Sequence, residues 1–138
     1  MKRCAHQISR HETTPVTFPP TAKPDLEALL IDTAIECWRF SRLFLRAAGK
    51  LDAGEGARYE NQLRYFLRRL EDNLTAAGMT LVNVEGQVFD AGMAATALNI
   101  EDFGPQEELV VDQMVEPIIM GTEGIRRMGT VMLRQASR

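Results

Sequence analysis

Histidine and cysteine are scarce in this chain of 138 residues, which has two of each. Both histidines, His6 and His11, precede the first predicted helix, so neither is placed to activate a Ser, Cys or Thr nucleophile in the folded part. A glycine-rich phosphate loop between a strand and a helix is also missing. Asp90 and Glu116 are the carboxylate pair to consider, but acids on a small sheet are usually solvated. We therefore expect a protein that is not an enzyme.

The two cysteines, Cys4 and Cys37, lie in a polar N-terminal stretch and inside a helical pattern. Two such cysteines do not make a disulfide framework, and they fit a reducing, cytoplasmic environment. Cys4, His6 and His11 would supply three metal ligands, but a zinc site normally needs four ligands held by folded structure. A solvated tail is the favoured interpretation, and we expect no metal and no other cofactor.

Long apolar runs are absent as well, since no segment approaches the roughly 18 consecutive apolar residues of a membrane span. The basic N-terminus lacks the apolar core of a secretory signal. The formal net charge of −3 predicts binding neither to nucleic acid nor to a membrane surface. Residues 79–138 are acidic, with four arginines against nine carboxylates, so a basic partner surface would complement them.

Residues 1–24 contain four of the six prolines and four of the basic side chains. Because proline removes backbone donors and fixes φ, we expect an extended or disordered arm here rather than a helix. A nucleic-acid binder that uses this basic arm is an outlying hypothesis, which salt-sensitive binding to generic DNA or RNA would support.

Two amphipathic helices are predicted within residues 25–78, because apolar residues recur there at alternating spacings of four and three. Asp25 and Asp52 stand where N-caps are expected. Gly49 and Gly78 stand where helices end on a glycine with left-handed backbone. The short loop between the two helices predicts an antiparallel hairpin.

The apolar faces of this hairpin are wider than a two-helix seam requires, because a second row of apolar residues lies beside the first. A second copy would cover them in a dimeric four-helix bundle, so a homodimer is the preferred prediction. Alternatively, the second row packs on the β half of the same chain. Charged residues such as Asp32, Arg39 and Arg42 are assigned to the remaining helix surface. The residues expected in the dimer interface are Leu30, Ile35, Trp38, Phe44, Leu63, Phe66 and Leu70.

Residues 79–138 predict a small antiparallel β domain, because short runs of β-branched and apolar residues alternate with glycine-containing turns. Gly121–Gly124 predicts a hairpin turn. The strands are expected at residues 79–84, 107–115, 118–120, 125–127 and 130–133, with 93–98 as a strand or a helical turn. The chain is thus expected to be α+β, with an arm (1–24), a helical hairpin for dimerisation (25–78) and a β domain for partner binding (79–138).

Four motifs follow one another along the chain. They are Leu29-Leu30-Ile31-Asp32, the helix-ending Gly78, Gly86-Gln87-Val88-Phe89-Asp90, and Val115-Glu116-Pro117 with Arg126 and a final strand at Val131-Met132-Leu133. In their order and spacing, over about residues 26–135, they resemble the C-terminal two-thirds of GrpE, the nucleotide exchange factor of DnaK-type chaperones.

The resemblance implies a co-chaperone that acts mechanically, without catalysis or cofactor. The β domain of one protomer would bind the nucleotide-binding domain of a DnaK-type chaperone or a related actin-fold ATPase. It would favour the open state of that domain and promote ADP release, since nucleotide binds the closed state better. Phe89 is expected to be structural. The residues expected to bind the partner are Gln87, Asp90, Glu116, Glu123, Arg126 and Arg127.

The chain also departs from the family pattern. Ala91 and Ala94 stand where the family has proline and histidine, Gln62 stands in place of a glycine, and the hairpin tip Gly121–Gly124 is rearranged. The long paired helix that precedes the bundle in the family is replaced by the proline-rich arm. These differences motivate an alternative, a GrpE-derived protein–protein interaction module without exchange activity.

Overall fold

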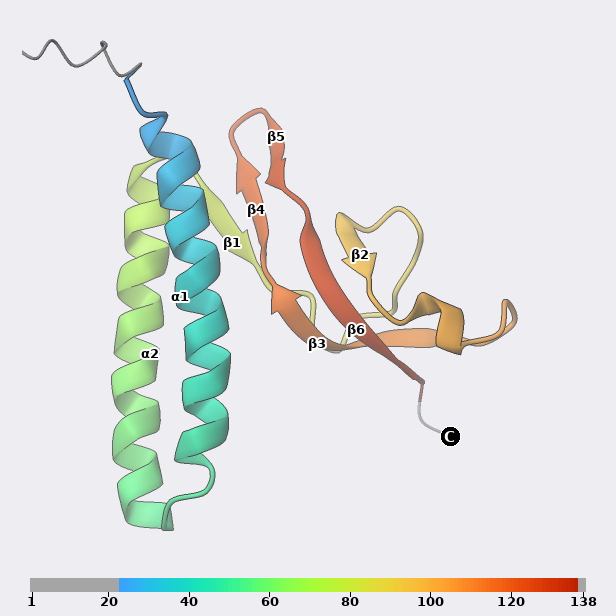
Figure 1. The fold of residues 1–138 in the computed structure, drawn as a ribbon, viewed down its shortest axis with the longest axis horizontal. Coiled ribbons are helices and arrows are strands. Elements are labelled where there is room, and N and C mark those ends of the chain that lie inside the picture. The colour runs from blue at the N-terminus through green and yellow to red at the C-terminus, as the bar shows by residue number, and fades with distance from the viewer. Residues whose placement is uncertain (1–22, 137–138) are drawn as a thin grey trace, which may run out of the picture.

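The computed structural model describes residues 23–136. The arm predicted for residues 1–24, with Cys4, His6 and His11, lies outside this range except for its last two residues. Two helices are followed by six short strands, so the α+β class is confirmed (Figure 1). The elements are α1 (Leu26–Ala48), α2 (Ala53–Ala76), β1 (Thr80–Val82), β2 (Ala95–Ala97), the 3-10 helix η1 (Ile100–Asp102), β3 (Leu109–Glu116), β4 (Ile118–Gly121), β5 (Gly124–Arg127) and β6 (Gly129–Gln135).

Both helices begin at the aspartates that the sequence indicates. The Asp25 carboxylate accepts hydrogen bonds from the N–H groups of Glu27 and Ala28 at 3.1 and 3.2 Å. The Asp52 carboxylate accepts one from the N–H of Glu55 at 2.9 Å. These bonds satisfy N–H groups that the first turn of a helix leaves without a partner, so each helix starts at a defined residue.

The two helix ends differ from one another. Gly78 has a φ of +77°, and the N–H of Met79 donates to the Leu74 carbonyl at 2.8 Å, as predicted for a helix that ends on a left-handed glycine. Gly49 has a φ of −65°, so the prediction of left-handed backbone is wrong there. The Gly49 N–H donates to the Leu45 carbonyl at 3.1 Å, and helical bonding therefore continues through this residue.

The β half consists of two three-stranded sheets with the orders β1-β4-β5 and β2-β6-β3. Every strand pair in them is antiparallel except β2–β6, which is parallel, so the prediction of a purely antiparallel β domain is wrong for this pair. Parallel neighbours require a long connection. Here η1, β3, β4 and β5 all lie between β2 and β6 in the chain. The predicted turn is present, with Gly121 paired to Gly124.

The β half lies to one side of the helical hairpin. Figure 1 shows the β4–β5 hairpin beside the N-terminal end of α1, whereas the loop between α1 and α2 extends beyond the sheets. The distal part of the helical hairpin is therefore not covered by the sheets.

The hydrophobic core is shared between the two halves. One cluster of buried side chains joins Trp38 of α1 to the β half, and the other joins both helices to Met79 and Ile119. Full burial of an aliphatic side chain contributes about 1.5–3 kcal/mol, so these contacts hold the sheets against the helices. The first cluster is Trp38, Val84, Ala95, Leu109, Val111, Met114, Ile118, Val131 and Leu133. The second is Ile31, Ala34, Ile35, Leu70, Leu74, Met79 and Ile119.

This core corrects part of the predicted dimer interface. Ile35 and Trp38 are buried against residues of their own chain, so a second copy cannot reach them. At Ile35 and Trp38 the second apolar row of α1 therefore packs on the β half, which is the alternative that the periodicity left open, whereas Leu45 of the same row is exposed. Periodicity shows that a helix face is covered, but the identity of the covering surface depends on contacts that are distant in the chain.

Candidate protein-interaction surfaces

The segment Gly86–Asp90 runs along the outer edge of β3. The N–H of Gly86 donates to the Val111 carbonyl at 2.8 Å, and the N–H of Val111 donates to the Gln87 carbonyl at 2.9 Å. Gly86 has a φ of +82°, which explains the glycine at this turn. The side chain of Gln87 is exposed, and so is that of Asp90, whose carboxylate accepts a hydrogen bond from the Gly92 N–H at 2.6 Å. Asp90 therefore shapes its own turn.

Glu116 is not free on the sheet surface. Its carboxylate forms an ion pair with the guanidinium of Arg39 on α1, which also pairs with Glu36 at 3.0 Å. The hydrogen bond to Glu116, the charge of Glu116 and the charge of Glu36, in that order, raise the pKa of Arg39 above its usual value. The ion pair of Glu116 with Arg39 thus links β3 to α1.

A second connection between α1 and the β half is centred on Arg42. Its guanidinium lies 4.3 Å from the centroid of the Trp38 ring and pairs with the Glu85 carboxylate at 2.5 Å. The same Glu85 oxygen accepts a hydrogen bond from the Met114 N–H at 2.9 Å. Arg39 and Arg42 are thus not free on the remaining helix surface, where their sequence positions predict them. The acidic residues that bind them are distant in sequence, and no local pattern indicates such partners.

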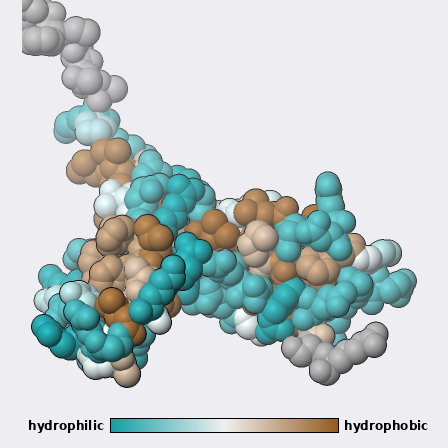
Figure 2. Space-filling model, turned by 60° about the horizontal axis from the view of Figure 1, so that its bottom comes forward, coloured by the Kyte–Doolittle hydropathy of each residue, from teal (hydrophilic) through white to brown (hydrophobic). Residues whose placement is uncertain are grey.

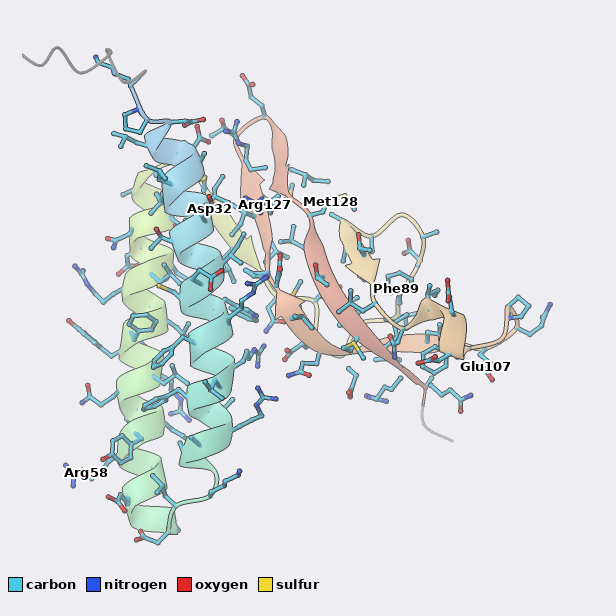
Figure 3. All side chains as sticks on the ribbon, viewed as in Figure 1. Asp32, Arg58, Phe89, Glu107, Arg127 and Met128 are labelled. Atoms are coloured by element: carbon cyan, nitrogen blue, oxygen red, sulfur yellow. The ribbon has the colours of Figure 1, made fainter. Side chains whose placement is uncertain are left out.

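The β4–β5 hairpin holds the other three residues expected to bind a partner. Glu123 is exposed at its tip. Arg126 pairs with Glu27 at 2.9 Å and Arg127 pairs with Asp32 at 2.6 Å, both across to α1. Figure 3 shows Asp32 and Arg127 pointing toward one another between the helix and the hairpin.

The predicted partner-binding residues therefore do not form a single cluster. In Figure 3, Phe89, which marks the segment of Gln87 and Asp90, lies beyond β6 as seen from α1, whereas Arg127 lies between α1 and β6. Asp90 and Glu116 each have their own partner, the Gly92 N–H and the Arg39 guanidinium respectively. The structure brings together Glu123, Arg126 and Arg127, on one hairpin.

The distal part of the helical hairpin carries an aromatic face, defined here as Phe40, Phe44, Tyr59, Tyr65 and Phe66. The ring centroids of Phe40 and Phe44 are 6.2 Å apart, and those of Phe44 and Tyr59 are 5.9 Å apart with an edge-to-face geometry. Figure 2 shows hydrophobic side chains gathered at this end of the molecule. A groove of about 390 Å³ is lined by Phe40, Phe44, Gln62, Leu63, Tyr65, Phe66 and Arg69.

The remaining residues of the predicted dimer interface are either wholly or partly buried in the chain itself or lie on the aromatic face. Leu63 and Leu70 are buried, and Leu30 is half-buried. Phe44 and Phe66 lie on the aromatic face, where Phe66 is exposed. The predicted interface omits Phe40, Tyr59 and Tyr65, although the first two belong to the apolar spacing of their helices. Tyr65 has no such signal, because it lies outside that spacing.

Comparison of the chain with protein-family models, with curated proteins and with solved structures finds no match. Within residues 23–136, neither helix combines the length and the apolar composition needed to cross a membrane.

Proposed function

We propose that this protein is a GrpE-like co-chaperone that binds the nucleotide-binding domain of a DnaK-type ATPase and promotes ADP release. The observation that carries the proposal is the order of parts. A helical hairpin with an uncovered aromatic face is followed by a β half whose β4–β5 hairpin is exposed at its tip. This is the arrangement that the motifs resembling GrpE imply.

In this proposal the β half acts on the partner through binding energy alone. Contacts from the β4–β5 hairpin favour the open state of the nucleotide-binding domain, and ADP binds the closed state more tightly. The affinity for ADP therefore falls, and by linkage ADP weakens the binding of this protein by the same factor. The charges available for these contacts are those of Glu123, Arg126 and Arg127.

The same proposal includes a homodimer formed through the aromatic face. Exposed aromatic side chains contribute large apolar areas to interfaces, and aromatic residues are enriched at the centre of protein interfaces. Two hairpins that bury this face against each other form a four-helix bundle. Because the β half covers the second apolar row at Ile35 and Trp38, the proposed dimer uses the aromatic face and not that row.

Release of fluorescently labelled ADP from a DnaK-type chaperone, with and without the full-length protein, tests the proposal. Saturating protein is expected to raise the Kd for ADP by about 5- to 150-fold, the usual range of coupling between sites. ADP must weaken binding of the protein by the same factor. The triple variant Glu123→Gln, Arg126→Gln, Arg127→Gln is expected to lose the effect, whereas Lys50→Gln in the distal loop is expected to retain it. Unchanged ADP release with every cognate candidate would exclude the exchange activity.

The alternative is an interaction module that binds its partner without exchange. The observations that favour it are Ala91 and Ala94, which replace the proline and histidine of the family pattern, and the engagement of Arg126 and Arg127 by α1. A stable complex that leaves the Kd for ADP unchanged would support this alternative over exchange.

A further inference from the structure

Two adjacent arginines of β5 reach the same helix, which the regular alternation of a strand does not favour. Successive side chains of a strand point to opposite faces. In β5, however, Arg127 pairs with Ile119 and Ile125 pairs with Met120, so Arg126 is an extra residue in the ladder. Such a bulge redirects side chains locally. Arg126 and Arg127 consequently both contact carboxylates of α1.

The ion pairs between α1 and the β half differ in their exposure. The side chains of Arg42 and Glu85 are 21% and 27% exposed, and those of Arg39 and Glu116 are 48% and 21% exposed. The pair Arg126–Glu27 is 42% exposed on both sides, and Arg127–Asp32 is 44% and 61% exposed. Ion pairs that are this accessible to water contribute little to stability, so other carboxylates can replace their acidic members at small cost.

We propose that Arg126 and Arg127 are the docking site for an acidic segment of the partner, and that Glu27 and Asp32 occupy this site in the free protein. This inference rests on the proposed function and specifies the chemistry of its partner. The surface already pairs with two carboxylates of its own chain, at 2.9 and 2.6 Å, and carboxylates of a partner would meet the same two guanidinium groups. Ile125 and Met128, which flank the two arginines in the sequence, are exposed as well.

Because Glu27 and Asp32 of α1 occupy the docking site, the free protein inhibits its own binding to the partner. The partner must displace Glu27 and Asp32 before it pairs with the arginines, so the apparent affinity is reduced by the fraction of molecules in which the site is closed. Removal of the two α1 carboxylates is therefore expected to strengthen binding of the partner, although it deletes two native contacts. A purely structural role of the same ion pairs predicts no such gain.

Four full-length proteins separate these roles: wild type, Glu27→Gln/Asp32→Asn, Arg126→Gln/Arg127→Gln, and the control Glu71→Gln/Asp72→Asn. The control removes the same charge from an exposed part of α2 where residues 23–136 provide no ion-pair partner. The first measurement needs no partner and follows phenylglyoxal labelling of Arg126 and Arg127 by mass spectrometry. Labelling is expected to be about 1.5- to 5-fold faster in Glu27→Gln/Asp32→Asn than in wild type or the control.

The second measurement is the Kd for the nucleotide-free nucleotide-binding domain of a DnaK-type chaperone. Glu27→Gln/Asp32→Asn is expected to bind about 2- to 10-fold more tightly than wild type, and Arg126→Gln/Arg127→Gln about tenfold more weakly. The control is expected to stay within about twofold of wild type. Equal labelling in all arginine-containing proteins, or binding by wild type without a gain in Glu27→Gln/Asp32→Asn, overturns this inference alone. A domain that binds none of the four proteins overturns the proposed function and this inference with it.

Discussion

The indole Nε1 of Trp38 donates a hydrogen bond to the backbone carbonyl of Met114 at 3.0 Å, and both residues are buried. Trp38→Phe is expected to lower the free energy of unfolding by about 1–3 kcal/mol, because it leaves a buried carbonyl without its donor. Trp38→Ala adds a cavity and is expected to cost about 3–5 kcal/mol. Urea denaturation followed by circular dichroism measures both. Leu98→Ala, at an exposed position, serves as the control, and a Trp38→Phe variant as stable as wild type would contradict the role of the indole N–H.

The Glu85 carboxylate accepts hydrogen bonds from the Arg42 guanidinium and from the Met114 N–H. Substitutions that remove one or both of these contacts are expected to lower the stability by different amounts. Glu85→Gln keeps an acceptor for the Met114 N–H but loses the ion pair with Arg42, and is expected to cost about 0.2–1 kcal/mol of unfolding free energy. Glu85→Ala also leaves the amide without a partner and is expected to cost about 1–3 kcal/mol. Denaturant titration distinguishes the two variants. Equal stability of both would show that the amide does not depend on this side chain.

Gly129 begins β6 at a position with no room for a side chain. An added Cβ would lie 2.8 Å from both Ile118 Cγ1 and Met114 Cε, and 3.0 Å from the Glu116 carbonyl oxygen. Gly129→Ala is therefore expected to lower the free energy of unfolding by about 1–3 kcal/mol through overpacking. Gly104→Ala is the matched control, since its nearest neighbour, Glu107 Cδ, is 4.0 Å away. Thermal or urea unfolding of both variants checks the difference.

The aromatic face supports a prediction about mass in solution. The wild-type protein is expected to scatter light as a dimer at micromolar concentration, and Phe66→Glu is expected to scatter as a monomer, because it places a charge in the proposed interface. Leu98→Glu adds the same charge at an exposed position of the β half and is expected to leave the dimer intact. Circular dichroism verifies that both variants fold. A monomeric wild type would contradict the proposed dimer.

The features that sequence analysis predicted correctly depend on nearby residues. The N-caps at Asp25 and Asp52, the left-handed glycine at Gly78 and the turn at Gly121–Gly124 each follow from a few consecutive positions. Such local signals depend on backbone geometry and side-chain hydrogen bonding within one turn, although the same glycine signal at Gly49 did not produce left-handed backbone.

The features that it missed depend on contacts across the chain. The parallel pair β2–β6 exists because a long connection returns β6 beside β2, and strand composition contains no information on that order. Burial of Trp38 was predictable from the width of the apolar face, but its partner Met114 was not. Arg126 and Arg127 pair with α1 from a strand that contains a bulge, and alternation along a strand does not reveal a bulge.

The hydrogen bond between Trp38 and Met114 joins residues that are 76 positions apart, and this separation affects the nascent chain. The helices are synthesised first, whereas the strands that cover Trp38 follow later. At the usual synthesis rate of about 5–20 residues per second, Met114 is added roughly 4–15 s after Trp38. During that interval the apolar row of α1 has no native cover from β3, so the growing chain exposes an aggregation-prone helix until the β half is complete.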